Sequence, residues 1–558
     1  MQVARSFFDK HRENLDKACQ AVITRECWSL YPEVPSGRIY GETANQEGKN
    51  AFQARLGKPF SVAGPTSDDV VSSEISPYTG ELEVSYSRYE ASALVGVAAE
   101  AMPAWRDAGP ELRTGVCLEI LERLNLCSFE MAYAVMHTTG QGFAMAFQAG
   151  GPHAQDRGLE AVACTWQAMS RIPSQARWSK PQGQRPPLVM DKRFHIVPRG
   201  VALVIACSTF PTWNTYPGLF ASLVAGNPVI IKPHPQAVLP VAISVEVAQR
   251  VLAEAGFDPR LVMLAADDEE RAMTRELATH PRVRLIDYTG GNLFGEWLSN
   301  NARQAQLYKE QAGINSVLID SVDNIDRVAQ NLAFSLSLYS GQMCTSPQAL
   351  LIPRDGVRTA DGVIPFDRVA ELICVAISGL LSDPERAVGV LGAIPSEATR
   401  ARLAAAVSLG EVVLASACHP HPLFEDARYC TPLVLKVNGD AQAWRQEQFG
   451  PIVFLVEVES TDQGMALVAE TVACQGAITL GVYTTDEQIL ERTERLAIDQ
   501  GVALSCNLDG GVFVNQSAAF SDFHATGNNP AANAAITDPA FVAGRFAVVQ
   551  SRRHAPQC

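Results

Sequence analysis

An alternation of short apolar runs with helical patterns constrains the fold of this chain of 558 residues more than any other feature. Residues 201–206 are an apolar run typical of a buried strand, residues 216–225 follow a helical pattern, and residues 228–232 are the next apolar run. The strand pattern returns at residues 284–288. Strands that alternate with helices predict a parallel sheet, because each helix carries the chain back to the start of the next strand. We therefore expect an α/β fold.

Composition limits the class of protein and its partners. The chain is 47% hydrophobic and 19% charged, so it can bury a large core, and its length predicts at least two domains. A formal net charge of −15 argues against nucleic acid or an anionic membrane as a partner. No apolar run approaches the ~20 residues that span a bilayer, and residues 1–11 contain no apolar signal segment. The 13 cysteines show no metal-ligand spacing, so we expect a reduced cytoplasmic protein with neither a metal site nor a disulfide framework.

One cysteine, Cys344, follows directly after a predicted amphipathic helix. We expect Ser321 or Asp323 to cap the start of this helix. Small residues surround Cys344 and leave room for a substrate to approach the sulfur. Taken alone, a cysteine is more often an inert buried thiol than a nucleophile. The helix is predicted from apolar residues that recur at helical spacing, namely Ile325, Val328, Leu332, Leu336 and Tyr339.

A glutamate 34 residues earlier, Glu310, gives the cysteine a chemical context. The E-x-x-G stretch at 310–313 and the G-Q-x-C-T stretch at 341–345 resemble the signature pair of the aldehyde dehydrogenase superfamily. The resemblance implies that Cys344 adds to an aldehyde and that Glu310 is the general base for the water that cleaves the resulting thioester. Without the pair, Glu310 would be expected to be a solvated or salt-bridged carboxylate.

Two further motifs resemble the cofactor site of the superfamily. Residues 289–295 are similar to its strand-turn-helix segment for the dinucleotide, which implies roles for Thr289, Gly290, Gly291 and Gly295. Glycines allow close approach of the backbone, and a helix N-terminus favours phosphate. The E-x-F-G-P motif at 447–451 implies that Glu447 binds the nicotinamide ribose and that Phe449 lies against the nicotinamide. Each motif alone also fits an ordinary glycine or proline turn.

The oxyanion position departs from the superfamily pattern W-N-F-P. Counting back 18 residues from Asn227, as the superfamily spacing implies, reaches Thr209 instead of an asparagine. A hydroxyl can also donate one hydrogen bond, although its reach is shorter than that of an amide. Asn214 is the alternative oxyanion donor, and the spacing favours Thr209.

The adenosine position also departs from the pattern, because the superfamily's K-P-S-E is replaced by Lys232-Pro233-His234-Pro235. Proline in place of the glutamate removes the carboxylate that would repel a 2′-phosphate. Lys232, and His234 when it is protonated, could attract that phosphate, so we expect NADP as the cofactor, with NAD as the alternative. Near the C-terminus the superfamily's S-G-x-G segment is replaced by residues 523–530, to which the sequence assigns no role.

The resemblance covers residues 76–549 and implies a Rossmann-type cofactor domain, an α/β catalytic domain and a small β oligomerisation arm. Residues 1–172 and 197–315 are assigned to the dinucleotide-binding domain with an N-terminal extension, and residues 316–515 to the catalytic domain. Residues 173–196 and 516–558 are assigned to oligomerisation, which implies a homodimer or homotetramer.

The implied activity is NAD(P)-dependent oxidation of an aldehyde to a carboxylic acid. The chain most resembles the aldehyde dehydrogenases of phenylacetate degradation, which implies a substrate that is ring-opened and CoA-linked. Two alternatives remain. One is a CoA-acylating dehydrogenase, in which CoA replaces water. The other is a non-catalytic binding protein of the same fold.

Overall fold

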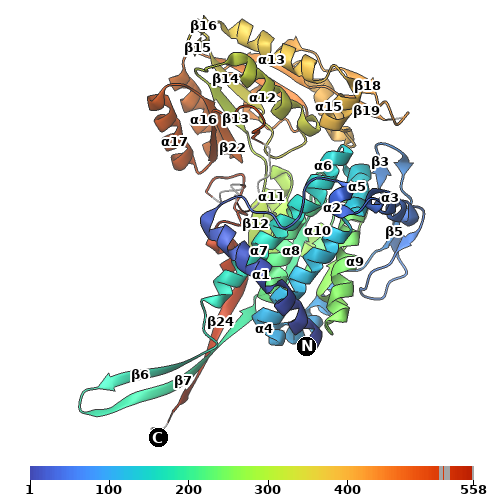
Figure 1. The fold of residues 1–558 in the computed structure, drawn as a ribbon, viewed down its shortest axis with the longest axis vertical. Helices are drawn as coiled ribbons and strands as arrows, with labels where there is room; N and C mark the ends of the chain where they lie inside the picture. Colours follow the sequence, from blue (N-terminus) through green and yellow to red (C-terminus); the bar gives the residue numbers. More distant parts are fainter. Residues whose placement is uncertain (426, 515–519, 521–523, 525–527, 556–558) are drawn as a thin grey trace.

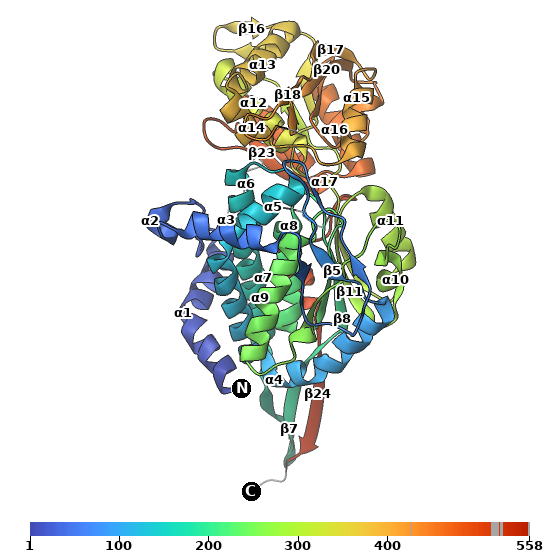
Figure 2. The same ribbon diagram turned by 90° about the vertical axis from the view of Figure 1, so that its right-hand side faces the viewer.

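The computed structural model describes residues 1–425, 427–514, 520, 524 and 528–555. Figures 1 and 2 show two α/β domains, one above the other, with a long β arm that projects from the lower, first domain away from the upper, second domain. No helix in the described ranges is both long and apolar enough to cross a membrane.

The first domain is built on a five-stranded parallel sheet with the order β10-β9-β8-β11-β12. All residues of β8, β9 and β10 are buried, as expected for a parallel sheet covered on both faces, and this explains their uninterrupted apolar runs. The parallel α/β prediction is confirmed. The strands are β8 (Val201–Ile205), β9 (Val229–Lys232), β10 (Val262–Leu264), β11 (Val283–Thr289) and β12 (Gln306–Glu310).

Proline and glycine residues shape the helices that cover this sheet. Helix α8 (Pro211–Ala225) begins five residues before the predicted helix, because Pro211 at its first position lacks the N–H that a helix start leaves unused. Helix α4 (Ala91–Leu126) bends at Gly109, φ 83°, the residue before Pro110. Further helices of the first domain include α5 (Ser128–Thr139), α7 (Pro152–Ser170), α9 (Leu239–Glu254), α10 (Thr274–Thr279) and α11 (Asn292–Asn301).

The N-terminal extension is part of the first domain's core. Helix α1 (Gln2–Thr24) buries Ala4, Phe8 and Leu15 on one face and packs against α4 and α7. The approach to α4 is close, since a Cβ at Gly115 would lie 2.5 Å from the Phe8 backbone nitrogen. Two further helices, α2 (Gly37–Tyr40) and α3 (Ala44–Arg55), follow α1.

The second domain has a seven-stranded sheet with the order β17-β20-β21-β14-β13-β22-β23, in which only the edge strand β17 is antiparallel to its neighbour. Helices α12 (Ile325–Ser337) and α13 (Phe366–Leu380) pack together on one face, and α16 (Thr461–Gln475) packs on β13 and β14. The strands are β13 (Ser316–Ile319), β14 (Ala349–Pro353), β17 (Glu411–Leu414), β20 (Leu433–Asn438), β21 (Ile452–Val458), β22 (Thr479–Tyr483) and β23 (Ala503–Cys506).

A hairpin in this domain contradicts the expectation of a chain without disulfides. Strands β18 (Cys418–Pro420) and β19 (Arg428–Cys430) pair antiparallel, with Cys418 directly opposite Cys430. Their Cα atoms are 4.1 Å apart, and the two sulfurs form a disulfide. The sequence pattern missed it because the pairing depends on the register of the hairpin and not on the spacing of the cysteines.

The arm is a three-stranded antiparallel sheet with the order β24-β7-β6. It consists of β6 (Gln175–Gln182), β7 (Arg185–Pro198) and β24 (Phe546–His554), and most of its residues are exposed. The segments assigned to oligomerisation contain β6, β24 and all of β7 except its last two residues. Residues 516–519, 521–523, 525–527 and 556–558 of these segments lie outside the described residues. In Figure 1 the arm extends well beyond the first domain.

Candidate active site

A strained turn presents Cys344 after helix α12. The helix is capped by Asn324, whose Oδ1 accepts a hydrogen bond from Arg327 N at 3.0 Å, so the cap is neither Ser321 nor Asp323 as predicted. After the helix, Tyr339 and Ser340 both adopt left-handed backbone angles, φ 51° and 50°. These angles are held in place because the Tyr339 hydroxyl donates to Thr139 O (2.5 Å) and the Ser340 hydroxyl to Leu391 O (3.1 Å).

Asn315 joins this turn to the central strands of the second domain. Its Nδ2 donates to the carbonyl oxygens of Cys344 and Ser346, at 2.6 and 3.1 Å. Its Oδ1 accepts from the backbone N–H groups of Ile478 and Thr479, both at 3.0 Å. One buried side chain therefore fixes the backbone on which the cysteine sits.

Glu310 lies at the end of β12, where the chain crosses to the second domain. Its backbone oxygen accepts from Gly290 N at 3.1 Å, and its carboxylate is buried. Oε1 accepts hydrogen bonds from Asn214 Nδ2 at 3.0 Å and from His524 Nε2 at 2.8 Å. The glutamate is therefore held beside the glycine turn that follows β11.

His524 brings the two sequence-predicted residues together. Its Nε2 lies 3.1 Å from Cys344 Sγ as well as 2.8 Å from Glu310 Oε1, and the residue is only 5% exposed. The imidazole packs against the Trp213 ring with centroids 4.9 Å apart, and the Arg157 guanidinium lies 3.7 Å from the Trp213 centroid. Sequence reasoning missed this histidine, although it lies in the segment that departs from the superfamily pattern.

The electrostatics of the cluster favour charged groups despite burial. Burial alone would raise the pKa of Glu310, but the His524 imidazolium, the Arg157 charge and the hydrogen bond from Asn214 together lower it. Burial alone would lower the pKa of His524, but the Cys344 sulfur and the Glu310 carboxylate raise it well above its usual range. The site therefore retains ionised side chains in a buried setting.

The three donor atoms all lie within 4.8 Å of one another, a spacing that metal ligands share. Two ligands of one tetrahedral zinc ion stand about 3.3–3.7 Å apart, because each bond is about 2.0–2.3 Å long. The contacts of 2.8 and 3.1 Å to Nε2 are instead hydrogen-bond distances. We assign the cluster as hydrogen bonded, and the absence of a metal site stays a prediction.

The predicted oxyanion residues occupy different places. Thr209 precedes α8, and its hydroxyl donates towards the Cys207 sulfur at 3.8 Å. Asn214, in the first turn of α8, donates to Glu310, while its Oδ1 accepts from the Cys207 thiol at 3.4 Å. The structure thus brings Asn214 into contact with the predicted base and places Thr209 next to Cys207.

The predicted dinucleotide turn lies directly beside Glu310, because Thr289 at the end of β11 pairs with Glu310 at the end of β12. A Cβ at Gly291 would meet nothing within 4 Å, so the turn is open there and leads into the N-terminus of α11. At Gly295 a Cβ would lie 2.5 Å from Gln311 Nε2, so a side chain there would displace the Gln311 amide. Gly290 donates its N–H to Glu310 O.

The second domain contributes Glu447 and Phe449 from the segment before β21. Glu447 is half-buried; burial raises its pKa, and Arg402 opposes the shift. The Phe449 carbonyl accepts from Arg402 Nη1 at 2.7 Å. Burial raises the pKa of Tyr288 on β11, and the charges of Cys207 and Glu447 add to that shift.

The adenosine-side residues differ from the sequence-based picture. Lys232, at the end of β9, is buried, and its Nζ lies 2.6 Å from Asp267 Oδ1. His234 is exposed, yet desolvation of its ring and the Lys232 ammonium lower its pKa to about 4, so the imidazole is neutral near pH 7. The positive charge expected to attract a 2′-phosphate is therefore largely compensated.

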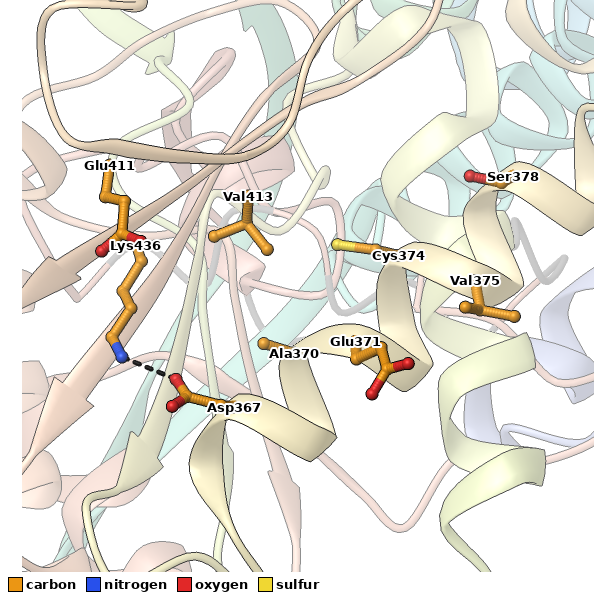
Figure 3. A pocket seen from close by; sticks show the side chains of 9 residues that line it. All are labelled: Asp367, Ala370, Glu371, Cys374, Val375, Ser378, Glu411, Val413 and Lys436. Atoms are coloured by element: carbon orange, nitrogen blue, oxygen red, sulfur yellow. Dashed lines mark hydrogen bonds and ion pairs between the residues drawn. The ribbon is translucent and has the colours of Figure 1, made fainter.

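A separate hollow of about 400 Å³ opens on the outer face of the second domain, between α13 and strands β17 and β20 (Figure 3). Its cation, Lys436, is already paired with Asp367 at 2.7 Å. The rest of its lining mixes apolar residues with carboxylates that face solvent, and none of the clustered site residues belongs to it. We assign no chemistry to this hollow.

Comparison with known proteins agrees with this architecture. The model of the aldehyde dehydrogenase family matches residues 66–514. A crystal structure described as an NAD-dependent aldehyde dehydrogenase from Burkholderia multivorans is 53% identical, with a TM-score of 0.97 and 99% of each chain covered. A 1-pyrroline-5-carboxylate dehydrogenase from Bacillus cereus (strain B4264) is 24% identical over 481 residues, which cover 80% of this chain and 85% of that protein.

Among curated relatives, the peroxisomal aminoaldehyde dehydrogenase 1 of Pisum sativum is 27% identical over 312 residues, covering 54% of this chain. The match spans 57% of that enzyme, so this chain aligns with little more than half the length of such relatives. The family match nevertheless covers most of this chain, and the fold, the Glu310 and Cys344 motifs and the two-domain architecture agree with it. The chain belongs to the aldehyde dehydrogenase family.

Proposed function

We propose that the protein oxidises an aldehyde to a carboxylic acid with a nicotinamide cofactor, through a thioester on Cys344. The observation that carries this proposal is the convergence of Cys344 Sγ and Glu310 Oε1 on one imidazole nitrogen, at 3.1 and 2.8 Å. The predicted nucleophile, Cys344, and the predicted base, Glu310, come from different domains and both lie beside the His524 imidazole. The test is oxidation of an aldehyde panel, followed by the absorbance of the reduced cofactor.

In the first half-reaction the Cys344 sulfur adds to the aldehyde carbon. The developing oxyanion is held by the backbone N–H of Cys344 and by the Thr209 hydroxyl, which must then turn from the Cys207 sulfur towards the substrate. A nicotinamide cofactor supplies the hydride acceptor when bound, and the residues proposed to hold it are Thr289, Gly290, Gly291, Glu447 and Phe449. The strained turn and Asn315 keep the sulfur in a fixed position during this step.

In the second half-reaction Glu310 accepts a proton from the water that cleaves the thioester. The Asn214 and His524 contacts both fall on Oε1, so we assign Oε2 as the proton acceptor. Asn214 is thus proposed as a positioning residue for Glu310, and not as the oxyanion donor. A base placed for water disfavours the CoA-acylating alternative, and turnover without CoA would exclude it.

We propose NAD as the preferred cofactor, which revises the preference for NADP. That preference depended on Lys232 and His234, and one is paired with Asp267 while the other is neutral near pH 7. The 53% identical structure is described as NAD-dependent, which supports the revision. The test is kcat/KM measured with both cofactors.

The substrate class and assembly are also proposals. A ring-opened, CoA-linked semialdehyde of phenylacetate degradation rests on resemblance alone, and relatives are named for other aldehydes, including 1-pyrroline-5-carboxylate. A panel that pairs free aldehydes with CoA-linked ones distinguishes these substrates. The projecting arm supports a homodimer or homotetramer, to be tested by light scattering of the intact chain and of a chain with a shortened β6–β7 hairpin.

A further inference from the structure

His524 has no part in the two-residue mechanism proposed above, yet it contacts both of its members. A neutral imidazole nitrogen can accept one proton, and a protonated one can donate one hydrogen bond. Here one nitrogen, Nε2, lies within hydrogen-bond distance of the Cys344 sulfur and the Glu310 carboxylate. The Cys344 thiol can therefore give its proton to Nε2, and the Glu310 carboxylate can stabilise the imidazolium that results.

We propose that His524 is a catalytic residue that takes the proton of Cys344, and that its positive charge then stabilises both the Cys344 thiolate and the Glu310 carboxylate. This inference rests on the proposed function. The S–H bond breaks, its electron pair stays on sulfur as the thiolate, and the proton binds Nε2. The resulting N–H is shared by Sγ and Glu310 Oε1. The thiolate then forms the C–S bond with the aldehyde.

The surroundings favour this charge-separated state. An ordinary thiol, with a pKa of about 8.5, is mostly protonated at neutral pH, and burial would raise that value further. The imidazolium compensates the thiolate, as in other buried cysteine and histidine pairs. Edge-to-face packing on Trp213 fixes the ring, so Nε2 is held between its two partners.

Among the described residues, the charged and titratable groups around His524 lie on four parts of the fold. They are Cys344 on its turn, Glu310 on β12, Arg157 on α7, which lies over Trp213, and Cys207 before α8, which donates to Asn214. Cys207 is neutral, because burial raises its pKa to about 11. Arg157 also lowers the pKa of Glu310, but less strongly than His524 does. The set therefore has two acids that depend on one imidazole.

The arrangement also couples the two half-reactions. Once Cys344 is a thioester, its negative charge is gone and His524 holds its proton less firmly. Release of that proton to solvent water, and not to Glu310, removes the cation beside Glu310, and the carboxylate is then free to deprotonate the water that cleaves the thioester. The histidine thus supports nucleophile formation first and base catalysis second.

The test is the pH profile of iodoacetamide alkylation at Cys344 in the full-length protein, recorded with and without EDTA by mass spectrometry of the Cys344 peptide. Profiles are compared by midpoint, because intrinsic thiolate reactivity changes with pKa. The wild type is expected to show a midpoint below pH 7. His524→Gln is expected to move it to an ordinary thiol value of about 8.5 or higher. His137→Asn, at a buried histidine that contacts Ser76 and Phe52 instead, is the matched control and should leave the midpoint unchanged.

A wild-type midpoint near 8.5, or equal midpoints in wild type and His524→Gln, would overturn the inference. A low midpoint that disappears on EDTA treatment would also overturn it, by assigning the thiolate to a bound metal ion. The wild-type profile decides the question even if His524→Gln does not fold. Failure of the proposed function is separate, since it would appear as aldehyde oxidation that persists in Cys344→Ala.

Discussion

Two buried charge clusters, the Arg545–Asp287 pair and the site around His524, are built in opposite ways. Arg545 donates to both Asp287 oxygens at 2.6 and 2.8 Å, to Ser222 Oγ at 2.7 Å and to Phe541 O at 2.9 Å. One cation meets one anion, and its guanidinium also stacks on aromatic rings. Around His524, one nitrogen serves two acids.

The difference separates a structural ion pair from a reactive site. A buried pair with matched charge and complete hydrogen bonding holds elements in place, here the segment before β24 against β11. A buried cluster with an excess of acids shifts proton affinities, which is what a nucleophile and a base require. The predictions below test this contrast, beginning with the largest expected effect.

Removal of the nucleophile should have the largest effect on activity. Cys344→Ala is expected to lower kcat for aldehyde oxidation by at least about 10³-fold, because no other group can form the thioester. Cofactor affinity should change little, as measured by fluorescence quenching. Steady-state oxidation retained in the folded variant would contradict the mechanism.

Removal of the base should block hydrolysis of the thioester and leave the first half-reaction intact. Glu310→Gln keeps the shape of the side chain and loses its basicity, so turnover is expected to fall by about 10²–10⁴-fold. A burst of reduced cofactor close to one equivalent per site should remain in stopped-flow measurements. A folded variant without a burst would show that Glu310 is also required for the first half-reaction.

Breaking the structural pair should affect stability and not chemistry. Arg545→Met leaves the Asp287 charge buried and uncompensated, which is expected to lower the free energy of unfolding by about 3–5 kcal/mol. The double variant Arg545→Met with Asp287→Leu should recover part of that loss. Arg552→Met, on the exposed face of β24, is the matched control, and urea titration measures all three. An equal effect in both single variants would contradict the assignment.

A third buried pair, Lys232–Asp267, should affect cofactor choice only modestly. Asp267→Asn leaves the Lys232 charge uncompensated and is expected to shift the ratio of kcat/KM for NADP over NAD upward by about tenfold, which is about 1.4 kcal/mol. Pro235→Glu should shift the same ratio downward by introducing a carboxylate. A wild type that prefers NADP tenfold would contradict the role assigned to the pair.

Sequence patterns predicted those parts of the fold that depend on residues close together in the chain. The apolar runs of β8, β9 and β11 and the spacing of Glu310 and Cys344 are such cases, because strand burial and a motif within 34 residues leave direct traces in the sequence. The predicted caps of α12, Ser321 and Asp323, lie three residues and one residue before the observed cap Asn324, since all three side chains can cap a helix.

Long-range contacts could not be predicted in the same way. His524 is 214 residues from Glu310 and lies in an aperiodic segment, so no pattern linked them. The Lys232–Asp267 pair left a usable signal, because β9 and β10 are adjacent and parallel and the residues after them meet at one edge of the sheet. The order of strands was needed to use it, and single-sequence patterns do not provide that order.

The arm imposes a waiting time during synthesis. Strand β7 ends at Pro198, and its partner β24 starts at Phe546, which is 546 − 198 = 348 residues later. At about 5–20 residues per second, a ribosome needs roughly 17–70 s to supply that partner. Until then β6 and β7 form a two-stranded hairpin, which is marginally stable alone, and one edge of β7 offers unpaired backbone groups to any strand nearby. The same edge that β24 later occupies is thus open to a neighbouring nascent chain for most of translation.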